Sequence, residues 1–281
     1  AVLLEKTPIV IMHGVYQNAA MMLPLVEFVR KMAPGRHIVN CEGISLLESM
    51  FSPIVDQVEE LSQCINNDKK LENGFIALGY SQGGYLFRNY IQNFNHIRYP
   101  VLRMISISNP LGGMYCGDTQ ECFILFRAIE KALPPEIGYQ DPAQNLVGAT
   151  NYWRDPKFLD LYLKGCHDLP LLDNLRDYSE QRKTNFMSVD RYILLGSPND
   201  GVITPWKSAF FGQYGKDDTE ILDFWERADY NDDNFGLKSM HEQGRIHLIE
   251  TPFGHVEYLM PRAHDFLAQH LVPWLDLDHQ E

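Results

Sequence analysis

The stretch Gly79-Tyr80-Ser81-Gln82-Gly83 has the form Gly-x-Ser-x-Gly, which is typical of a nucleophile elbow. The short apolar run 74–78 before it predicts a buried strand, and residues 85–91 after it predict a helix. A strand that turns sharply into a helix leaves the serine hydroxyl exposed near the free N–H groups of the helix N-terminus. The flanking glycines allow close packing that a Cβ would block. We therefore predict that Ser81 is a nucleophile.

The rest of the chain predicts a parallel sheet, because apolar segments of strand length alternate with segments of helical spacing. Strands are expected at 8–12, 37–41, 74–78, 101–107, 190–196 and 245–250. Helices are expected at 19–32, 53–65, 85–91 and 260–271, with Ser52 capping the second of them. This alternation is typical of an α/β fold whose mainly parallel sheet carries helices on both faces.

The alternation stops between about residues 112 and 188. This segment is rich in large apolar side chains and predicts short helices and loops without a clear strand. We expect a single domain over residues 1–281, with a helical cap inserted at about 112–188. Such a cap would lie over the edge of the sheet and shape a pocket there.

Composition excludes several classes of function. The chain has 281 residues, 45% of them hydrophobic, and a formal net charge of −13 without a Lys/Arg cluster, so we expect no nucleic-acid partner. No apolar run reaches the ~20 residues of a transmembrane helix. The sequence contains no Cys-x-x-Cys pair, so we expect neither a metal nor another cofactor. The opening segment, Ala1 to Leu4, suggests a mature form whose targeting segment has been removed.

A serine nucleophile needs a base within hydrogen-bond reach and an acid that orients the base. In hydrolases with this elbow, the acid and then the histidine follow the serine along the chain, each after a late strand. Asp200 follows the strand expected at 190–196, and His255 follows the one expected at 245–250. Asp190 competes as the acid, but it begins its strand and would lie at the wrong end of a parallel sheet. We therefore predict a triad of Ser81, Asp200 and His255.

The same pattern predicts the oxyanion hole. One backbone N–H should come from the loop after the first strand, where His13-Gly14-Val15 stands, and Val15 is our candidate. The second should be the N–H of Gln82, the residue after the nucleophile. We interpret His13 itself as a packing and hydrogen-bonding residue.

The five cysteines leave at least one thiol unpaired unless chains are cross-linked. Cys116 and Cys122 flank a polar loop that a disulfide would close into a small ring. Their spacing is equally compatible with two ordinary thiols.

Several longer motifs resemble the palmitoyl-protein thioesterases. The elbow Gly79–Gly84 is one, and residues 151–156 and 160–163 are others. The most specific is the string from Asp200 to Ser208 with Trp206 at its centre, which continues into residues 210–214 and is similar to the second of the two lysosomal types. The resemblance extends from about Pro8 to Trp274, with a patchy match in the cap.

This resemblance implies an α/β-hydrolase that cleaves thioesters of long-chain fatty acids, such as palmitoyl-CoA or S-palmitoylated proteins, through an acyl-enzyme on Ser81. It also implies a lysosomal or secreted location and a disulfide between Cys116 and Cys122. The sequence departs from the family in two ways, which are the absence of Asn-x-Ser/Thr sites and three further cysteines, Cys41, Cys64 and Cys166, without matching partners.

Two alternatives remain open at this point. The same triad would serve a lipase or carboxylesterase that acts on oxygen esters, and the fold would also serve a catalytically inactive lipid-binding protein. A long acyl chain needs an apolar groove, since each buried CH₂ contributes about 0.8 kcal/mol. We expect this groove where the cap meets the sheet edge. The acyl acceptor and the oligomeric state are not predicted.

Overall fold

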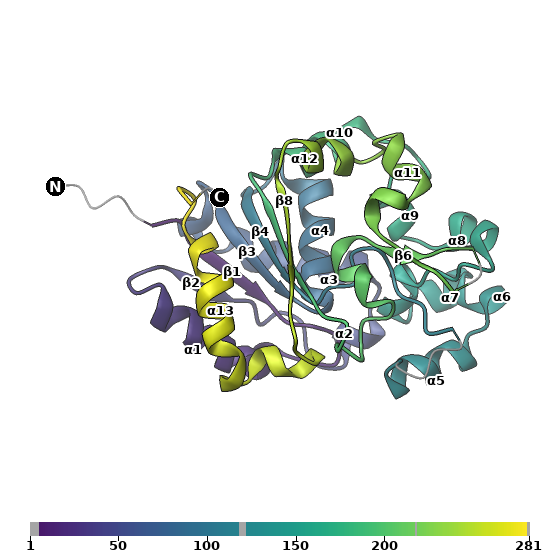
Figure 1. The fold of residues 1–281 in the computed structure, drawn as a ribbon, viewed down its shortest axis with the longest axis horizontal. Coiled ribbons are helices and arrows are strands. Elements are labelled where there is room, and N and C mark those ends of the chain that lie inside the picture. The colour runs from purple at the N-terminus through teal and green to yellow at the C-terminus, as the bar shows by residue number, and fades with distance from the viewer. Residues whose placement is uncertain (1–5, 118–121, 217, 280–281) are drawn as a thin grey trace.

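The computed structural model describes residues 6–117, 122–216 and 218–279 and is built around a six-stranded parallel sheet (Figure 1). The strand order is β2-β1-β3-β4-β5-β8, and every neighbouring pair is parallel. The strands are β1 Ile9–Met12, β2 Ile38–Asn40, β3 Phe75–Tyr80, β4 Val101–Ile107, β5 Tyr192–Gly196 and β8 Ile246–Glu250. The predicted α/β-hydrolase sheet is therefore confirmed, with each strand at its expected place in the chain.

Helices cover both faces of this sheet (Figure 1). Successive side chains of a strand point to opposite faces, so Ile9 and Ile11 of β1 join a different core cluster from Val10. The first cluster is covered by α1 (Leu23–Met32) and α13 (His264–His270). The second is covered by α3 (Ile54–Asn66), α4 (Gln82–Phe94) and α10 (Glu180–Ser188).

The start of α3 differs from the prediction. Ser52 ends the preceding short helix, α2 (Glu48–Phe51), and makes no side-chain capping bond to α3. The acceptor comes instead from Asn151, whose side-chain oxygen accepts a 2.8 Å hydrogen bond from the Ile54 N–H. The predicted Ser52 cap is wrong because a residue 97 positions away supplies the acceptor, and a local sequence rule cannot detect such a partner.

Between β4 and β5 the described residues form six α-helices, one 3₁₀ helix and no strand, apart from one isolated bridge between Met114 and Trp153. The helices are α5 Ile124–Ala132, α6 Pro135–Gly138, α7 Asp141–Gln144, α8 Leu159–Gly165, α9 Leu169–Leu172 and α10. Figure 1 shows α5 to α8 together at the end of the molecule opposite the N-terminus, whereas α10 packs against α4. The inserted segment thus has two parts, a projecting cap and a helix that belongs to the sheet's cover.

A second excursion, between β5 and β8, was not predicted. Besides two 3₁₀ helices it contains a two-stranded antiparallel sheet and two short α-helices, which are β6 Gln213–Tyr214, β7 Ile221–Leu222, α11 Ala228–Asn231 and α12 Leu237–Glu242. These elements are too short to produce a periodic signal in the sequence. Over the described ranges, no helix has the length and apolar character needed to cross a membrane.

Two pairs of cysteines are joined in the structure. One joins Cys116 to Cys122, and the ring residues 118–121 lie outside the described ranges. The other joins Cys41, just after β2, to Cys64 of α3, with a Cα–Cα distance of 5.9 Å. Sequence reasoning found no partner for these two residues. Cys166 is a free, buried thiol.

Candidate active site

Ser81 stands on a strained turn between β3 and α4. Its backbone angles are φ 53° and ψ −133°, a conformation that few non-glycine residues adopt. The turn is possible because its neighbours lack side chains. A Cβ added at Gly79 would lie 2.3 Å from the Cα of Gly84, and one at Gly83 would lie 2.3 Å from the carbonyl oxygen of Met12. The local sequence therefore produces the elbow that its pattern predicts.

The structure brings the three predicted triad side chains into one chain of hydrogen bonds. His255 Nε2 lies 2.9 Å from Ser81 Oγ, and His255 Nδ1 lies 2.9 and 3.0 Å from the two carboxylate oxygens of Asp200. All three residues are buried. Asp200 follows β5 and His255 follows β8, so the carboxyl ends of three strands of the sheet deliver these groups to one edge.

The environment of Asp200 favours its ionised form. Burial opposes the charge, but the interaction with His255 and hydrogen bonds from the protein lower the pKa of Asp200 below its usual value. Its Oδ1 accepts the N–H groups of Val202 and Ile203 at 3.0 and 2.7 Å. A carboxylate can only accept hydrogen bonds, so the proton of the imidazole stands on Nδ1 and leaves Nε2 free to accept the Ser81 proton.

Tyr80 and the backbone hold His255 in place. The Tyr80 hydroxyl donates to the His255 carbonyl oxygen at 2.9 Å, and the two rings lie 5.2 Å apart between centroids. The His255 N–H donates in turn to the Asp200 carbonyl oxygen at 3.0 Å. Sequence reasoning missed Tyr80, which occupies a variable position of the elbow pattern and therefore carries no signal of its own.

The two predicted oxyanion donors, Gln82 and Val15, belong to segments that lie next to the serine. Gln82 is the first residue of α4, and neither its N–H nor that of Val15 has a hydrogen-bond acceptor among the described residues. The loop after β1 is close to Ser81, because a Cβ added at Gly14 would lie 2.6 Å from the Ser81 Cβ. Two N–H donors at this place suit an alkoxide that develops on a carbonyl oxygen.

His13 has the structural role that the sequence suggested. Its ring nitrogens lie 2.9 and 3.0 Å from the carbonyl oxygens of Gly14 and Ile44. Burial lowers the pKa of His13 although both contacts oppose this shift. The side chain thus ties the loop after β1 to the segment before α2.

Asp190, the competing acid, lies away from this site. It precedes β5 and forms a 2.5 Å ion pair with the buried Arg103 of β4. The opposite ends of a parallel strand cannot both reach one edge of the sheet, so Asp190 and Asp200 are separated by the whole length of β5. No cluster of His, Cys, Asp or Glu suited to a metal ion occurs in the described parts of the chain.

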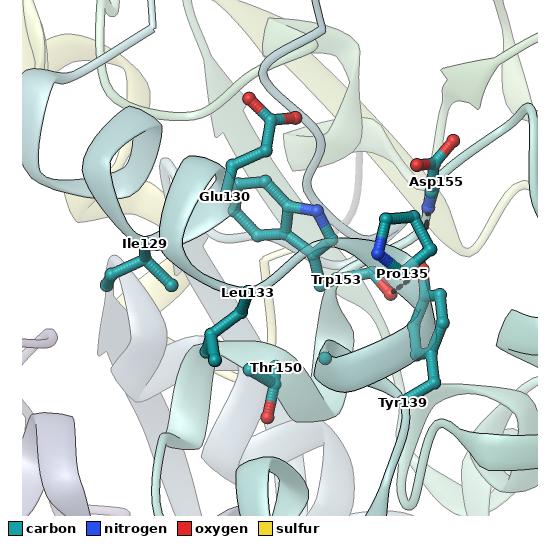
Figure 2. A pocket seen from close by; sticks show the side chains of 9 residues that line it. Ile129, Glu130, Leu133, Pro135, Tyr139, Thr150, Trp153 and Asp155 are labelled. Carbon is teal, nitrogen blue, oxygen red and sulfur yellow. Dashed lines mark hydrogen bonds between the residues drawn. The ribbon is translucent and has the colours of Figure 1, made fainter.

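The cap contains a small, mainly apolar pocket (Figure 2). Ile129 of α5 and Leu133, which directly follows this helix, form one wall, and Tyr139 and Trp153 also line the pocket. The pocket is also lined by Glu130, Pro135, Gly138, Thr150 and Asp155. Thr150 and Tyr152 share one 3₁₀ turn, Gly148–Tyr152, and the Tyr152 hydroxyl donates to Gln82 Oε1 at 2.8 Å. The pocket therefore adjoins the turn that contacts the nucleophile's neighbour.

Comparison with known proteins identifies relatives over nearly the whole chain. The sequence model of the family described as palmitoyl protein thioesterase matches residues 8–255. The chain is 32% identical to the lysosomal thioesterase PPT2 homolog of Drosophila melanogaster, over 98% of this chain and 94% of that protein. It is 30% identical to the lysosomal thioesterase PPT2 of Homo sapiens, over 95% and 87% of the two chains. Palmitoyl-protein thioesterase 3 of Dictyostelium discoideum is 29% identical over 89% and 86%.

The family model spans the elbow, the segment that carries Asp200, and His255, so the match includes every part of the site described above. Together with the parallel sheet and its strand order, the match shows that the chain belongs to the palmitoyl protein thioesterase family and is a thioester hydrolase of α/β-hydrolase fold.

Proposed function

We propose that this protein hydrolyses thioesters of long-chain fatty acids through an acyl-enzyme on Ser81, with His255 as base and Asp200 as the orienting acid. The observation that carries the proposal is the continuous set of contacts from Asp200 through both ring nitrogens of His255 to Ser81 Oγ. A neutral serine hydroxyl is a weak nucleophile, and this geometry is the one that activates it.

The reaction proceeds in two halves. Ser81 Oγ bonds to the thioester carbonyl carbon while its proton moves to His255 Nε2, and the N–H groups of Val15 and Gln82 stabilise the oxyanion. The C–S bond then breaks, and the thiolate takes the proton from His255. Water, deprotonated by His255, attacks the acyl carbon, and His255 returns the proton to Ser81 Oγ as the fatty acid is released. A thiolate leaves readily, so this enzyme needs less general-acid assistance than a protease.

The acyl chain occupies the apolar pocket of the cap in this proposal. Its walls are mainly aliphatic and aromatic, which suits a methylene chain. Each methylene that enters would contribute about 0.8 kcal/mol, so kcat/KM should rise by up to roughly fourfold per carbon until the pocket is full. A flat profile from acetyl to stearoyl thioesters would instead favour a short-chain carboxylesterase.

Two further parts of the proposal concern organisation and location. We treat residues 1–281 as one domain in which the segment at about 112–188 is a cap insertion. The relatives in fly and human are named lysosomal thioesterases, and we propose a lysosomal or secreted location for this chain too. The paired cysteines support such a compartment, because disulfides persist under oxidising conditions.

The decisive experiment compares turnover of palmitoyl-CoA, an S-palmitoylated peptide and p-nitrophenyl palmitate by the wild type and by Ser81→Ala. We expect both thioesters to be cleaved and Ser81→Ala to abolish fluorophosphonate labelling. Preference for the oxygen ester would support a lipase. A wild-type protein that neither labels nor turns over any of the three would be a lipid-binding protein without catalysis.

A further inference from the structure

The side chain of Gln82 forms part of a buried hydrogen-bond network that the reaction itself does not use. Its Nε2 donates to the Ser49 carbonyl oxygen at 2.9 Å and to Gln57 Oε1 at 2.8 Å. Its Oε1 accepts the Tyr152 hydroxyl at 2.8 Å. Gln82, Gln57, Ser49 and Tyr152 are each about 1% exposed. Buried polar groups are costly unless paired, so this network is closely specified.

The orientation of both amides follows from their partners. Gln57 Nε2 donates to the carbonyl oxygens of Ser49 and Ser52 at 3.3 and 2.8 Å. Gln57 Oε1 therefore faces Gln82 as an acceptor. If the Gln82 amide were flipped, its oxygen would face the Ser49 carbonyl and Gln57 Oε1, and three acceptors would repel one another. The network has one satisfied arrangement, which fixes the Gln82 side chain against α2 and α3.

The same network reaches the other half of the oxyanion hole through Ser49. The Ser49 hydroxyl accepts the Tyr16 N–H at 2.8 Å and donates to the Leu46 carbonyl oxygen at 2.7 Å. Tyr16 directly follows Val15 and has φ 54°, a left-handed conformation that a tyrosine rarely adopts. A single serine thus holds the loop that carries the Val15 N–H and, through its carbonyl, the residue that carries the second N–H.

We propose that Ser49, Gln57 and Tyr152 are positioning residues that hold the Val15 and Gln82 N–H groups at the separation that an oxyanion requires. The inference rests on the oxyanion assignment made above and extends it. Tyr152 belongs to the inserted segment, whereas Gln82 begins the nucleophile helix. The cap thereby contributes to transition-state stabilisation through a hydroxyl that contacts neither the triad nor the two N–H groups.

Displacement of one donor is expected to be costly, since the loss of an oxyanion donor lowers kcat by about 10²–10³. Tyr152→Phe removes only a hydroxyl and keeps the ring that packs 4.9 Å from Tyr85. We expect kcat for a palmitoyl thioester to fall by about tenfold with KM changed by less than about twofold. Ser49→Ala acts on the Val15 side and should lower kcat in the same way.

Tyr162→Phe is the matched control. Tyr162 is also a buried tyrosine of the inserted segment, and its hydroxyl has no hydrogen-bond partner within the described residues. This variant should keep the wild-type kcat. Thermal unfolding of all three variants shows whether a loss of activity reflects a loss of folded protein.

Inhibitor affinities separate positioning from a merely structural role. A long-chain alkyl trifluoromethyl ketone forms a hemiketal with the serine and places an oxyanion in the hole, whereas the thioether analogue of the substrate does not. Tyr152→Phe should weaken binding of the ketone by about tenfold, in step with the fall in kcat, and should leave the affinity for the thioether unchanged. Equal weakening of both would make Tyr152 a substrate-binding residue and overturn the proposal.

A wild-type kcat for Tyr152→Phe, as expected for the control Tyr162→Phe, would also overturn the positioning proposal. Failure of the proposed function has a different signature, because the ketone reports on the oxyanion hole even without thioester turnover. If the wild type cleaves no thioester but still binds the ketone more tightly than Ser81→Ala does, the proposed function fails while the positioning proposal is still tested by the ketone. The two failures are therefore distinguishable.

Discussion

At the scale of single residues, the site depends on which aspartate reaches the histidine. Asp200 lies beyond the carboxyl end of β5 and receives two backbone N–H groups, which keep it ionised and oriented. Asp190 lies at the other end of the same strand and pairs with Arg103. Two acids ten positions apart thus have different roles, which follow from the direction of one strand.

We predict that Asp200→Asn lowers kcat by about 10⁴-fold with a small change in KM, because an amide cannot hold the imidazole in the same tautomer. Asp190→Asn should lower the free energy of unfolding by leaving the buried Arg103 unpaired, and should leave kcat within about twofold. Steady-state kinetics and thermal unfolding of the two variants test this. Near-normal turnover by Asp200→Asn together with an inactive Asp190→Asn would mean that the acid is misassigned.

At the scale of elements, helix α5 forms one wall of the proposed acyl pocket. Ile129 faces the pocket, whereas Ile124 on the same helix is 80% exposed. This contrast makes a matched pair of substitutions possible within three turns of helix. The acyl chain length that the enzyme prefers should therefore depend on a few side chains of this one short helix.

We predict that Ile129→Trp shortens the preferred acyl chain by several carbons and leaves kcat/KM for the short thioesters unchanged, because the larger ring fills part of the pocket. Ile124→Trp should leave the profile unchanged. The measurement is kcat/KM across acyl-CoA thioesters from acetyl to stearoyl, below their micelle-forming concentrations. Identical profiles for both variants would show that the acyl chain binds elsewhere.

At the scale of the whole molecule, the half-buried Asp168 couples the fold to pH. Asp168, at the start of α9, accepts the Tyr85 hydroxyl at 2.7 Å and the Asn89 amide at 2.5 Å, both from α4. Burial raises the pKa of Asp168 to about 6, although these hydrogen bonds and Arg88 oppose the rise. The inserted segment and the nucleophile helix therefore meet at a carboxyl group that is partly protonated in mildly acidic solution.

The raised pKa of Asp168 makes the free energy of unfolding depend on pH. Between the unfolded pKa of about 3.9 and the folded value of about 6, the folded state binds more protons, so the free energy of unfolding rises as pH falls through this range. Because the residue is partly exposed, we expect a gain of only about 1 kcal/mol. Thermal unfolding between pH 7 and pH 4.5 should show a smaller gain for Asp168→Asn. An equal gain in both proteins would assign the effect to other groups.

The disulfides act on the whole chain by restricting its unfolded state. The pair Cys41–Cys64 is separated by 23 positions, so we expect it to contribute about 3 kcal/mol to the free energy of unfolding. Reduction should lower the Tm of the wild type more than that of the Cys41→Ser, Cys64→Ser double variant. Mass spectrometry of an unreduced digest should find the Cys41–Cys64 and Cys116–Cys122 cross-links, with Cys166 alkylated only after unfolding. Free thiols at Cys116 and Cys122 would weaken the case for an oxidising compartment.

The sequence by itself determined the sheet and its chemistry, because these depend on local patterns. Apolar runs predict strands. The glycines that the Ser81 turn requires all lie within a few residues of it in the sequence. The chain order of serine, acid and histidine then identifies the candidate triad. The confirmed predictions of family, fold and thioester hydrolysis all rest on such contiguous stretches.

Only the tertiary structure decided the contacts that join distant segments. Asn151 caps α3, Cys41 pairs with Cys64, and the Tyr152 hydroxyl contacts Gln82 across 70 positions. None of these partners has a sequence signal, because a buried polar group needs some partner and any nearby segment can provide it. The candidate triad of Ser81, Asp200 and His255 follows from the sequence pattern. Tyr80, which holds His255, and the residues that hold the oxyanion loop and the cap follow from how the folded chain packs.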